Sequence, residues 1–384
     1  MTALKRLMAD WYRDLSEGEG PVVYLPVGGN VAELPRACGF RVFFPEVNAL
    51  QCALRKVAGE FILRAEEQGY SPDVCGYVKS DMGLAASGGS GPFGTIPKPD
   101  ILLCTTSGCS TTLKWFEALA GIHEAPLFVL DVPSVRDGAA DPHALRYVVR
   151  QVEELASVLE KIGRRKPSRD RLAETLERSR QAEDLWMEIL DSARAKPSPF
   201  DAFFEAVFFM APITVLRGTP ECVEYYRAAR EEVRGRVAEP ERRRIVVDGP
   251  PPWPHFRAFR DLFKRWGARC VASTYVRVGG DWDEGFRHDP SRPFESMAEF
   301  AARCYTNRSL PARRAILERE IRRFDADALV IHSVRSCRPY SVGQACLRVR
   351  DVPTLFLESD LADPRHFNEG EMRTRVDAFF EVAR

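Results

Sequence analysis

The sequence contains no stretch of about 18 consecutive apolar residues, and its first 20 residues form an amphipathic, acid-containing segment without the apolar core of a signal peptide. A membrane-spanning helix and a secretory signal are therefore not expected. The chain also lacks net charge, since 55 lysine and arginine residues balance 55 aspartate and glutamate residues. This balance argues against a dedicated surface for nucleic acid or anionic lipid. We expect a cytoplasmic protein whose partners are neither nucleic acids nor membranes.

Short ligand-binding motifs are missing as well. There is no GxxxxGK[ST] and no nicotinamide-type GxGxxG after a strand, so this chain is not expected to bind ATP or NAD. There is also no CxxC and no Cys/His pair at zinc-finger spacing, which excludes a metal site formed by neighbouring residues. Ten cysteines are nevertheless present, and a reducing compartment disfavours disulfides. Any metal cluster must draw its ligands from distant parts of the sequence.

The order of strand-like and helix-like segments predicts an α/β protein. Its length of 384 residues favours two or three domains, and an apolar fraction of 45% is enough to fill two cores. Strands and helices alternate in residues 1–140 and again in 241–384, which is typical of parallel sheets covered by helices. Residues 141–240 are mostly long, charged and helically periodic. We predict two Rossmann- or flavodoxin-like lobes with a helical region between them, and a single helix over residues 49–68.

Two segments of the sequence repeat each other. Asp100 is followed by ILLCTTSG and Cys109, and Asp327 is followed by ALVIHSVRS and Cys337. A proline comes 17 residues after the first of these cysteines and 16 after the second, and each proline precedes an apolar strand that ends in an acid. In open parallel sheets, ligands bind outside the carboxyl ends of the strands. A chain with a cysteine just beyond two equivalent strand ends is expected to hold a group between them, and we interpret that group as an iron–sulfur cluster.

Three cysteines are the predicted ligands: Cys75, Cys109 and Cys337. Cys104 is closer to Cys75 in sequence spacing than Cys109 is, but it occupies the strand position that His332 fills in the other copy. We therefore assign Cys104 to the core. Cys75 precedes a stretch rich in glycine and serine, whose backbone can approach an inorganic group closely. Three thiolates leave the fourth iron of a cubane without a protein ligand, which favours reactivity over electron storage. The alternative is that all three are ordinary buried cysteines.

Other candidate residues have two interpretations each. His288 in GFRHDP is either a catalytic proton donor or a structural hydrogen-bonding residue. Glu46, just after a predicted strand, either lines the site or caps a helix. Arg335, Arg338 and Tyr340 flank the third cysteine, where they either tune the cluster or meet a phosphate, or are simply loop residues.

Longer stretches resemble a known family. They include PEVNALQCALRKVAGEFILRAEEQGYSPDVCGYVKSDMG, TSGCSTTLKWFE, VVDGPPPW, GFRHDP, SCRPYSVGQ and ESDLADPRHF. From about residue 20 onward the chain resembles the 2-hydroxyacyl-CoA dehydratase / benzoyl-CoA reductase superfamily, and within it the B subunits of ATP-dependent benzoyl-CoA reductases. The chain departs from them by being a few residues shorter between Gln344 and Pro353 and by its short N-terminal extension, which leaves substrate and partner choice open.

The resemblance implies two α/β lobes and a [4Fe–4S]-type cluster, or a double cubane, on the three cysteines named above. It implies four partners: a homologous C-type subunit that shares the acyl-CoA site, ATP-hydrolysing activator subunits with their own cluster, ferredoxin as the upstream donor, and an aryl-CoA substrate. The implied reaction reduces the aromatic ring to a cyclic diene, one electron at a time. The alternatives are a 2-hydroxyacyl-CoA dehydratase subunit that recycles its electron, a double-cubane cluster reductase, and a structural paralogue.

Overall fold

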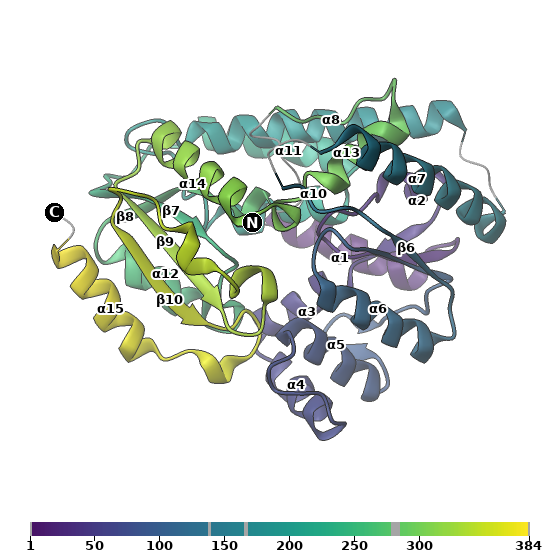
Figure 1. Ribbon diagram of the computed structural model, residues 1–384, viewed down its shortest axis with the longest axis horizontal. Coiled ribbons are helices and arrows are strands. Elements are labelled where there is room, and N and C mark those ends of the chain that lie inside the picture. The colour runs from purple at the N-terminus through teal and green to yellow at the C-terminus, as the bar shows by residue number, and fades with distance from the viewer. Residues whose placement is uncertain (1, 137–139, 165–167, 278–284, 383–384) are drawn as a thin grey trace.

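Two four-stranded parallel sheets form the centre of the molecule (Figure 1). The computed structural model describes residues 2–136, 140–164, 168–277 and 285–382. The first sheet contains β1 (Val22–Tyr24), β2 (Arg41–Phe43), β5 (Ile101–Thr105) and β6 (Leu127–Leu130). The second contains β7 (Arg243–Asp248), β8 (Ala268–Ser273), β9 (Ala328–Val334) and β10 (Thr354–Ser359). The predicted pair of Rossmann-like lobes is confirmed.

The two sheets have the same topology. Their strand orders are β2-β1-β5-β6 and β8-β7-β9-β10, so in each sheet the second strand of the chain lies at one edge and the first and third strands are central. All pairings within both sheets are parallel. The strand order reverses between the first and third strands, and the loops that follow these strands diverge to opposite sides. This is the point at which open α/β sheets bind ligands.

Hydrogen bonds confirm the internal repeat. The side chain of Asp100 accepts from the N–H of Val22 at 2.7 Å, and its own N–H donates to the carbonyl of Val22 at 2.8 Å. In the second lobe, Asp327 makes the same two bonds to Arg244, at 2.7 and 2.8 Å. The two acids that open the repeats therefore fix the third strand of each sheet against the first.

Helices cover the sheets and hold the lobes together. Those of the first lobe are α2 (Glu33–Ala37), α3 (Pro45–Leu54), α4 (Ala58–Glu67), α5 (Gly76–Ala86) and α6 (Ser110–His123). Those of the second are α12 (Phe256–Lys264), α14 (Leu310–Phe324) and α15 (Glu369–Val382). The single helix predicted over residues 49–68 is wrong: the chain forms α3 and α4 instead, because Lys56 adopts a φ of 64° and turns the chain between them.

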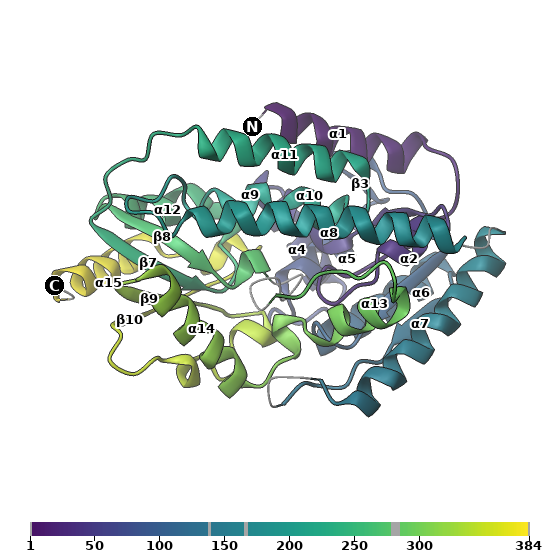
Figure 2. The same ribbon diagram turned by 90° about the horizontal axis from the view of Figure 1, so that it is seen from above.

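The long helices of the middle segment pack over the lobes. They are α7 (Pro142–Gly163), α8 (Arg169–Ser192) and α11 (Pro220–Arg234), with the short α9 (Ala206–Phe209) and α10 (Ala211–Val215) between them. Helix α7 packs against α2 and β6, which both belong to the first lobe. Figure 2 shows α8 and α11 side by side over the two sheets. Later in the chain, α13 (Pro293–Ala302) returns to pack against α7. The domain boundaries near residues 140 and 240 stay a prediction.

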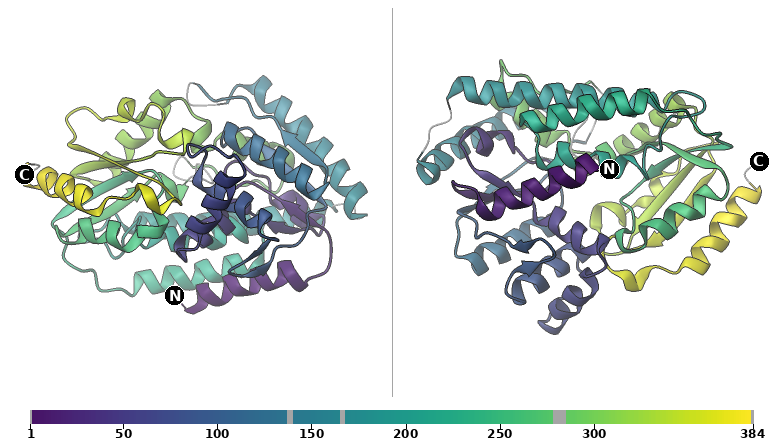
Figure 3. Two further views of the ribbon diagram at one scale, coloured as in Figure 1. Left: turned by 90° about the horizontal axis from the view of Figure 1, so that it is seen from below. Right: turned by 180° about the vertical axis from the view of Figure 1, so that it is seen from behind.

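The N-terminal helix lies on the outside of this arrangement. Helix α1 (Thr2–Glu17) packs beside α10 and α11 (Figure 3). A two-stranded hairpin, β3 (Ser90–Gly91) and β4 (Gly94–Thr95), follows α5 at the surface. Within the described ranges, no helix combines the length and the apolar character needed to cross a bilayer.

Candidate functional site

A cavity of about 200 Å³ lies where the two lobes meet. The loops after the first strands of both sheets line it through Gly28 and Pro250, and the loops after the third strands line it through Cys109 and Cys337. In each lobe, the loops on either side of the strand-order reversal therefore line this one cavity. Most of the remaining lining is apolar, and it includes side chains from α1, α3, α9 and α10.

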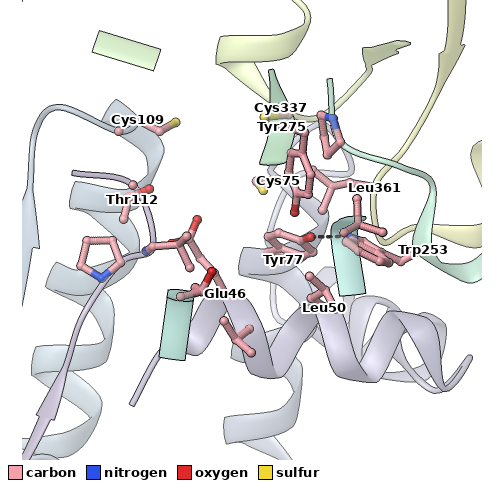
Figure 4. A pocket seen from close by; sticks show the side chains of 18 of the residues that line it. Glu46, Leu50, Cys75, Tyr77, Cys109, Thr112, Trp253, Tyr275, Cys337 and Leu361 are labelled. Carbon is pink, nitrogen blue, oxygen red and sulfur yellow. Dashed lines mark hydrogen bonds between the residues drawn. The ribbon is translucent and has the colours of Figure 1, made fainter. Parts of the chain in front are cut away.

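All three predicted cysteine ligands line this cavity. Figure 4 shows Cys75 and Cys337 on one side of it and Cys109 on the opposite side. Each cysteine immediately precedes a helix: Cys75 precedes α5, Cys109 precedes α6, and Cys337 precedes a 3₁₀ turn. The first N–H groups of a helix have no partner within it and attract negative charge. Both α-helices therefore begin at a position that favours a thiolate.

Burial makes two of the three thiols reluctant to ionise. Burial raises the pKa of Cys75 to about 12, and the N–H groups of Tyr77 and Val78 oppose this rise. Burial also raises the pKa of Cys337, and negative charge on Cys75 or Cys109 raises it further. Buried thiols of this kind are suited to a cationic group, because metal binding removes their protons and compensates the charge.

The three thiols do not form a site for a single ion. No three His, Cys, Asp or Glu side chains among the described residues are grouped closely enough to hold one metal ion. A cubane bonds each thiolate through a different iron, so its ligands are spread around a space and do not meet at a point. The three cysteines line the cavity from two sides, and their role as ligands of a [4Fe–4S]-type group stays a prediction.

Two neighbouring features clarify the choice of cysteines. Cys104 is fully buried within β5, as His332 is within β9, and neither lines the cavity. The glycines and serines in the stretch after Cys75 do not line the cavity as expected, although Val78 does. The first part of the stretch forms α5 and buries Gly83, whereas Gly88 and Gly94 lie at the surface with φ values of 89° and 95°.

Glu46 also lines the cavity. It lies in the first turn of α3, but its side chain does not cap that helix and instead accepts a hydrogen bond from the N–H of Val27 in the loop after β1. The structure therefore agrees with the site-lining interpretation and not with the capping one. Burial raises the pKa of its carboxyl group, and the Val27 N–H opposes that rise. A buried carboxyl group of this kind holds a proton more readily than an exposed one.

An aromatic cluster beside Cys75 was not predicted from the sequence. The indole nitrogen of Trp253 donates to the hydroxyl of Tyr77 at 2.7 Å, and the hydroxyl of Tyr275 points toward Tyr77 (Figure 4). Burial raises the pKa of both tyrosines, so their hydroxyls keep their protons. These residues come from three separate elements, and no local pattern in the sequence connects them.

His288 lies elsewhere. It is buried and does not line the cavity; its Nδ1 is 2.6 Å from Glu183 of α8, and its Nε2 is 3.7 Å from Glu33 of α2. Arg217 pairs with the same Glu33 carboxylate. The structure supports the structural interpretation of His288. Of the residues that flank Cys337, Tyr340 lines the cavity, whereas Arg335 and Arg338 do not.

We expect His288 to make the stability of the protein depend on pH. Burial alone lowers its pKa, but the carboxylates of Glu183 and Glu33 outweigh burial and raise it above 6.5. The stabilisation from its proton is therefore complete below about pH 6.5 and is lost as the pH rises through the folded-state pKa. Urea midpoints measured from pH 6 to 9 should show that His288→Gln is most destabilising at low pH. The exposed His143→Gln is the control, and a difference between His288→Gln and wild type that stays constant with pH would contradict this role.

Comparisons with known proteins show the family of this chain. Residues 31–383 match the family model described as 2-hydroxyglutaryl-CoA dehydratase, D-component. The B subunit of benzoyl-CoA reductase from Thauera aromatica is 39% identical over 406 residues, covering 100% of this chain and 94% of that protein. The alpha subunit of (R)-phenyllactyl-CoA dehydratase from Clostridium sporogenes is 26% identical, covering 91% and 86%. The alpha subunit of lactoyl-CoA dehydratase from Anaerotignum propionicum is also 26% identical, covering 90% and 86%.

Proposed function

Because this chain belongs to the 2-hydroxyglutaryl-CoA dehydratase D-component family, we propose that it is the iron–sulfur catalytic subunit of an ATP-dependent aryl-CoA reductase of the benzoyl-CoA type. The observation that carries this proposal is the full-length similarity, at 39% identity, to the B subunit of a benzoyl-CoA reductase. The three cysteines around one largely apolar cavity support it, because a cluster there would meet the substrate directly.

The cluster would supply low-potential single electrons to the substrate. The apolar side chains around it, such as Leu50, Val207 and Phe208, exclude water from the space that an aromatic ring would occupy. The hydroxyls of Tyr77 and Tyr275 keep their protons, and burial raises the pKa of the nearby Glu46 carboxyl group. This combination of a dry space and retained protons suits a reaction that places negative charge on a ring and then protonates it.

The proposed partners supply what this chain lacks. The sequence contains no nucleotide-binding motif of its own, so ATP hydrolysis is assigned to separate activator subunits, with ferredoxin as the upstream electron donor. Several relatives are named as subunits, which supports a hetero-oligomer. A homologous C-type subunit would complete the acyl-CoA site at the open side of the cavity.

The test uses the assembled complex under anaerobic conditions with ATP, a strong reductant and benzoyl-CoA or a substituted analogue. The aryl-CoA should disappear as a cyclohexadienyl thioester forms, and activity should vanish when ATP is omitted or air is admitted. Two electrons should be consumed per turnover. Dehydration of a 2-hydroxyacyl-CoA without ring reduction, and with catalytic use of electrons, would instead support a dehydratase subunit.

Glu46→Gln should lower kcat by about 10²-fold, the usual contribution of a positioned proton donor. Glutamine can still accept the hydrogen bond from Val27, so the iron content should stay at the wild-type level. The measurement is kcat with benzoyl-CoA alongside iron content for the same preparations. Glu60→Gln, on the exposed face of α4, is the matched control. If Glu46→Gln kept full turnover, Glu46 would not be a proton donor, and its role would be to hold the loop at Val27.

A further inference from the structure

A hydrogen bond between the lobes joins the two residues that neighbour Cys75 and Cys337. Gly76, the residue after Cys75, belongs to the first lobe, and Ser336, the residue before Cys337, belongs to the second. The N–H of Gly76 donates to Oγ of Ser336 at 3.1 Å. The two residues are 260 positions apart in the sequence, so this bond is a contact between lobes made directly beside two of the predicted ligands.

A buried carboxylate holds the serine in place. Asp360 follows β10, and its side chain accepts hydrogen bonds from both the N–H and the hydroxyl of Ser336. Its other oxygen accepts from the N–H groups of Ala362 and Asp363, each at 2.9 Å. Asp360 is 1% exposed. Four donors satisfy both oxygens of this buried carboxylate and fix its orientation.

The backbone of the first lobe rests directly on this carboxylate. A Cβ atom added to Gly76 would lie 2.7 Å from Oδ1 of Asp360 and 3.1 Å from Cβ of Ala362. Only glycine permits so close an approach. The geometry thus places Asp360 beside the loops of two predicted ligands without making it one.

We propose that Asp360 is a positioning residue which, through Ser336, holds the Cys75 and Cys337 loops against each other across the two lobes. The inference rests on the iron–sulfur cluster of the proposed function. The negative charge of the Asp360 carboxylate has a second effect, because adding an electron to a cluster beside a buried anion is unfavourable. The cluster potential should therefore be lower than it would be without Asp360, as the reduction of an aromatic ring requires.

The experiment compares three variants of the full chain, each loaded with iron and sulfide under anaerobic conditions. Ser336→Ala removes the link and keeps the charge, and Asp360→Asn removes the charge. Asp201→Asn is the matched control, because Asp201 is also a buried carboxylate that accepts backbone hydrogen bonds, but its donors are Phe203, Phe204 and Cys270 and not the loops of the cavity cysteines. The readouts are iron content, the rate of iron loss to a chelator, and the midpoint potential from a redox titration followed by electron paramagnetic resonance.

Ser336→Ala should lose iron about tenfold faster than wild type, the change expected when one buried hydrogen bond is lost. Asp360→Asn should also lose iron faster, and its midpoint potential should shift in the positive direction. Asp201→Asn should match wild type in iron content, in the rate of iron loss and in midpoint potential. The proposal is overturned if Ser336→Ala and Asp360→Asn both match the control.

If Asp360→Asn takes up no iron, Ser336→Ala decides: faster iron loss supports the positioning role, and wild-type behaviour refutes it. Failure of the underlying function gives a different result, since wild-type protein would then hold no cluster, or Cys337→Ala would keep one.

Discussion

Cys337→Ala is expected to lose most of its iron when purified anaerobically, and its complex is expected to lose all turnover. Cys337 is one of three thiols around the cavity and one of two that come from equivalent loops of the repeated unit. With only two thiolates left, the cluster has too few anchors to persist. The effect should appear in kcat and not only in KM, because the lost interaction belongs to the chemical step. Cys75→Ala and Cys109→Ala should behave in the same way.

Cys104→Ala is the matched control for this experiment. Cys104 is equally a cysteine near the end of a third strand, but it is buried within β5 and does not line the cavity. The variant should keep its iron and its spectrum, with a modest loss of stability from the small cavity it leaves. If Cys337→Ala and Cys104→Ala both retain full iron, the ligand assignment is wrong.

Arg217→Met should lower the free energy of unfolding by about 3–5 kcal/mol, the usual result of removing one partner of a buried ion pair. Arg217 is 3% exposed and pairs with Glu33, which is 0% exposed. Its guanidinium also donates to Asn30 at 2.9 Å and lies 4.1 Å from the ring centroid of Phe300. The substitution would leave the buried Glu33 carboxylate without this ion-pair partner, although its hydrogen bond from Ser179 would remain. Urea denaturation of the full chain measures the change.

Arg373→Met provides the comparison for this prediction. Arg373 pairs with Glu369 one turn away on α15, and both side chains are about half exposed. Exposed pairs of this kind contribute less than about 1 kcal/mol. If Arg217→Met and Arg373→Met lowered the free energy of unfolding equally, the buried network around Arg217 would contribute no more than a surface pair, and the prediction would be wrong.

The features that the sequence predicts well are those encoded locally. The repeat is visible because its acid, strand, cysteine loop and second strand follow one another within about 30 residues, and the hydrogen bonds of Asp100 and Asp327 show why the acids recur. The choice of Cys109 over Cys104 follows from the same alignment of the two copies, and the structure places only Cys109 at the cavity.

The features that it did not predict depend on contacts between distant residues. Trp253 and Tyr77 are 176 positions apart, and neither lies in a pattern that predicts their hydrogen bond. The role of His288 stayed open because its partner Glu183 lies 105 positions earlier, on a helix whose charged sequence suggested exposure. The break between α3 and α4 depends on the conformation of Lys56 alone, a single-residue choice that helical periodicity does not reveal.

The division of the cavity between two lobes determines when the protein can mature. Cys75 and Cys109 emerge early in synthesis, but Cys337 comes late, and β10, which completes the second sheet, comes later still. The ribosome must therefore release almost the entire chain before the proposed cluster can be inserted. Until then the three thiols remain without metal and open to oxidation. Production in aerated cells should therefore yield folded chains that lack iron.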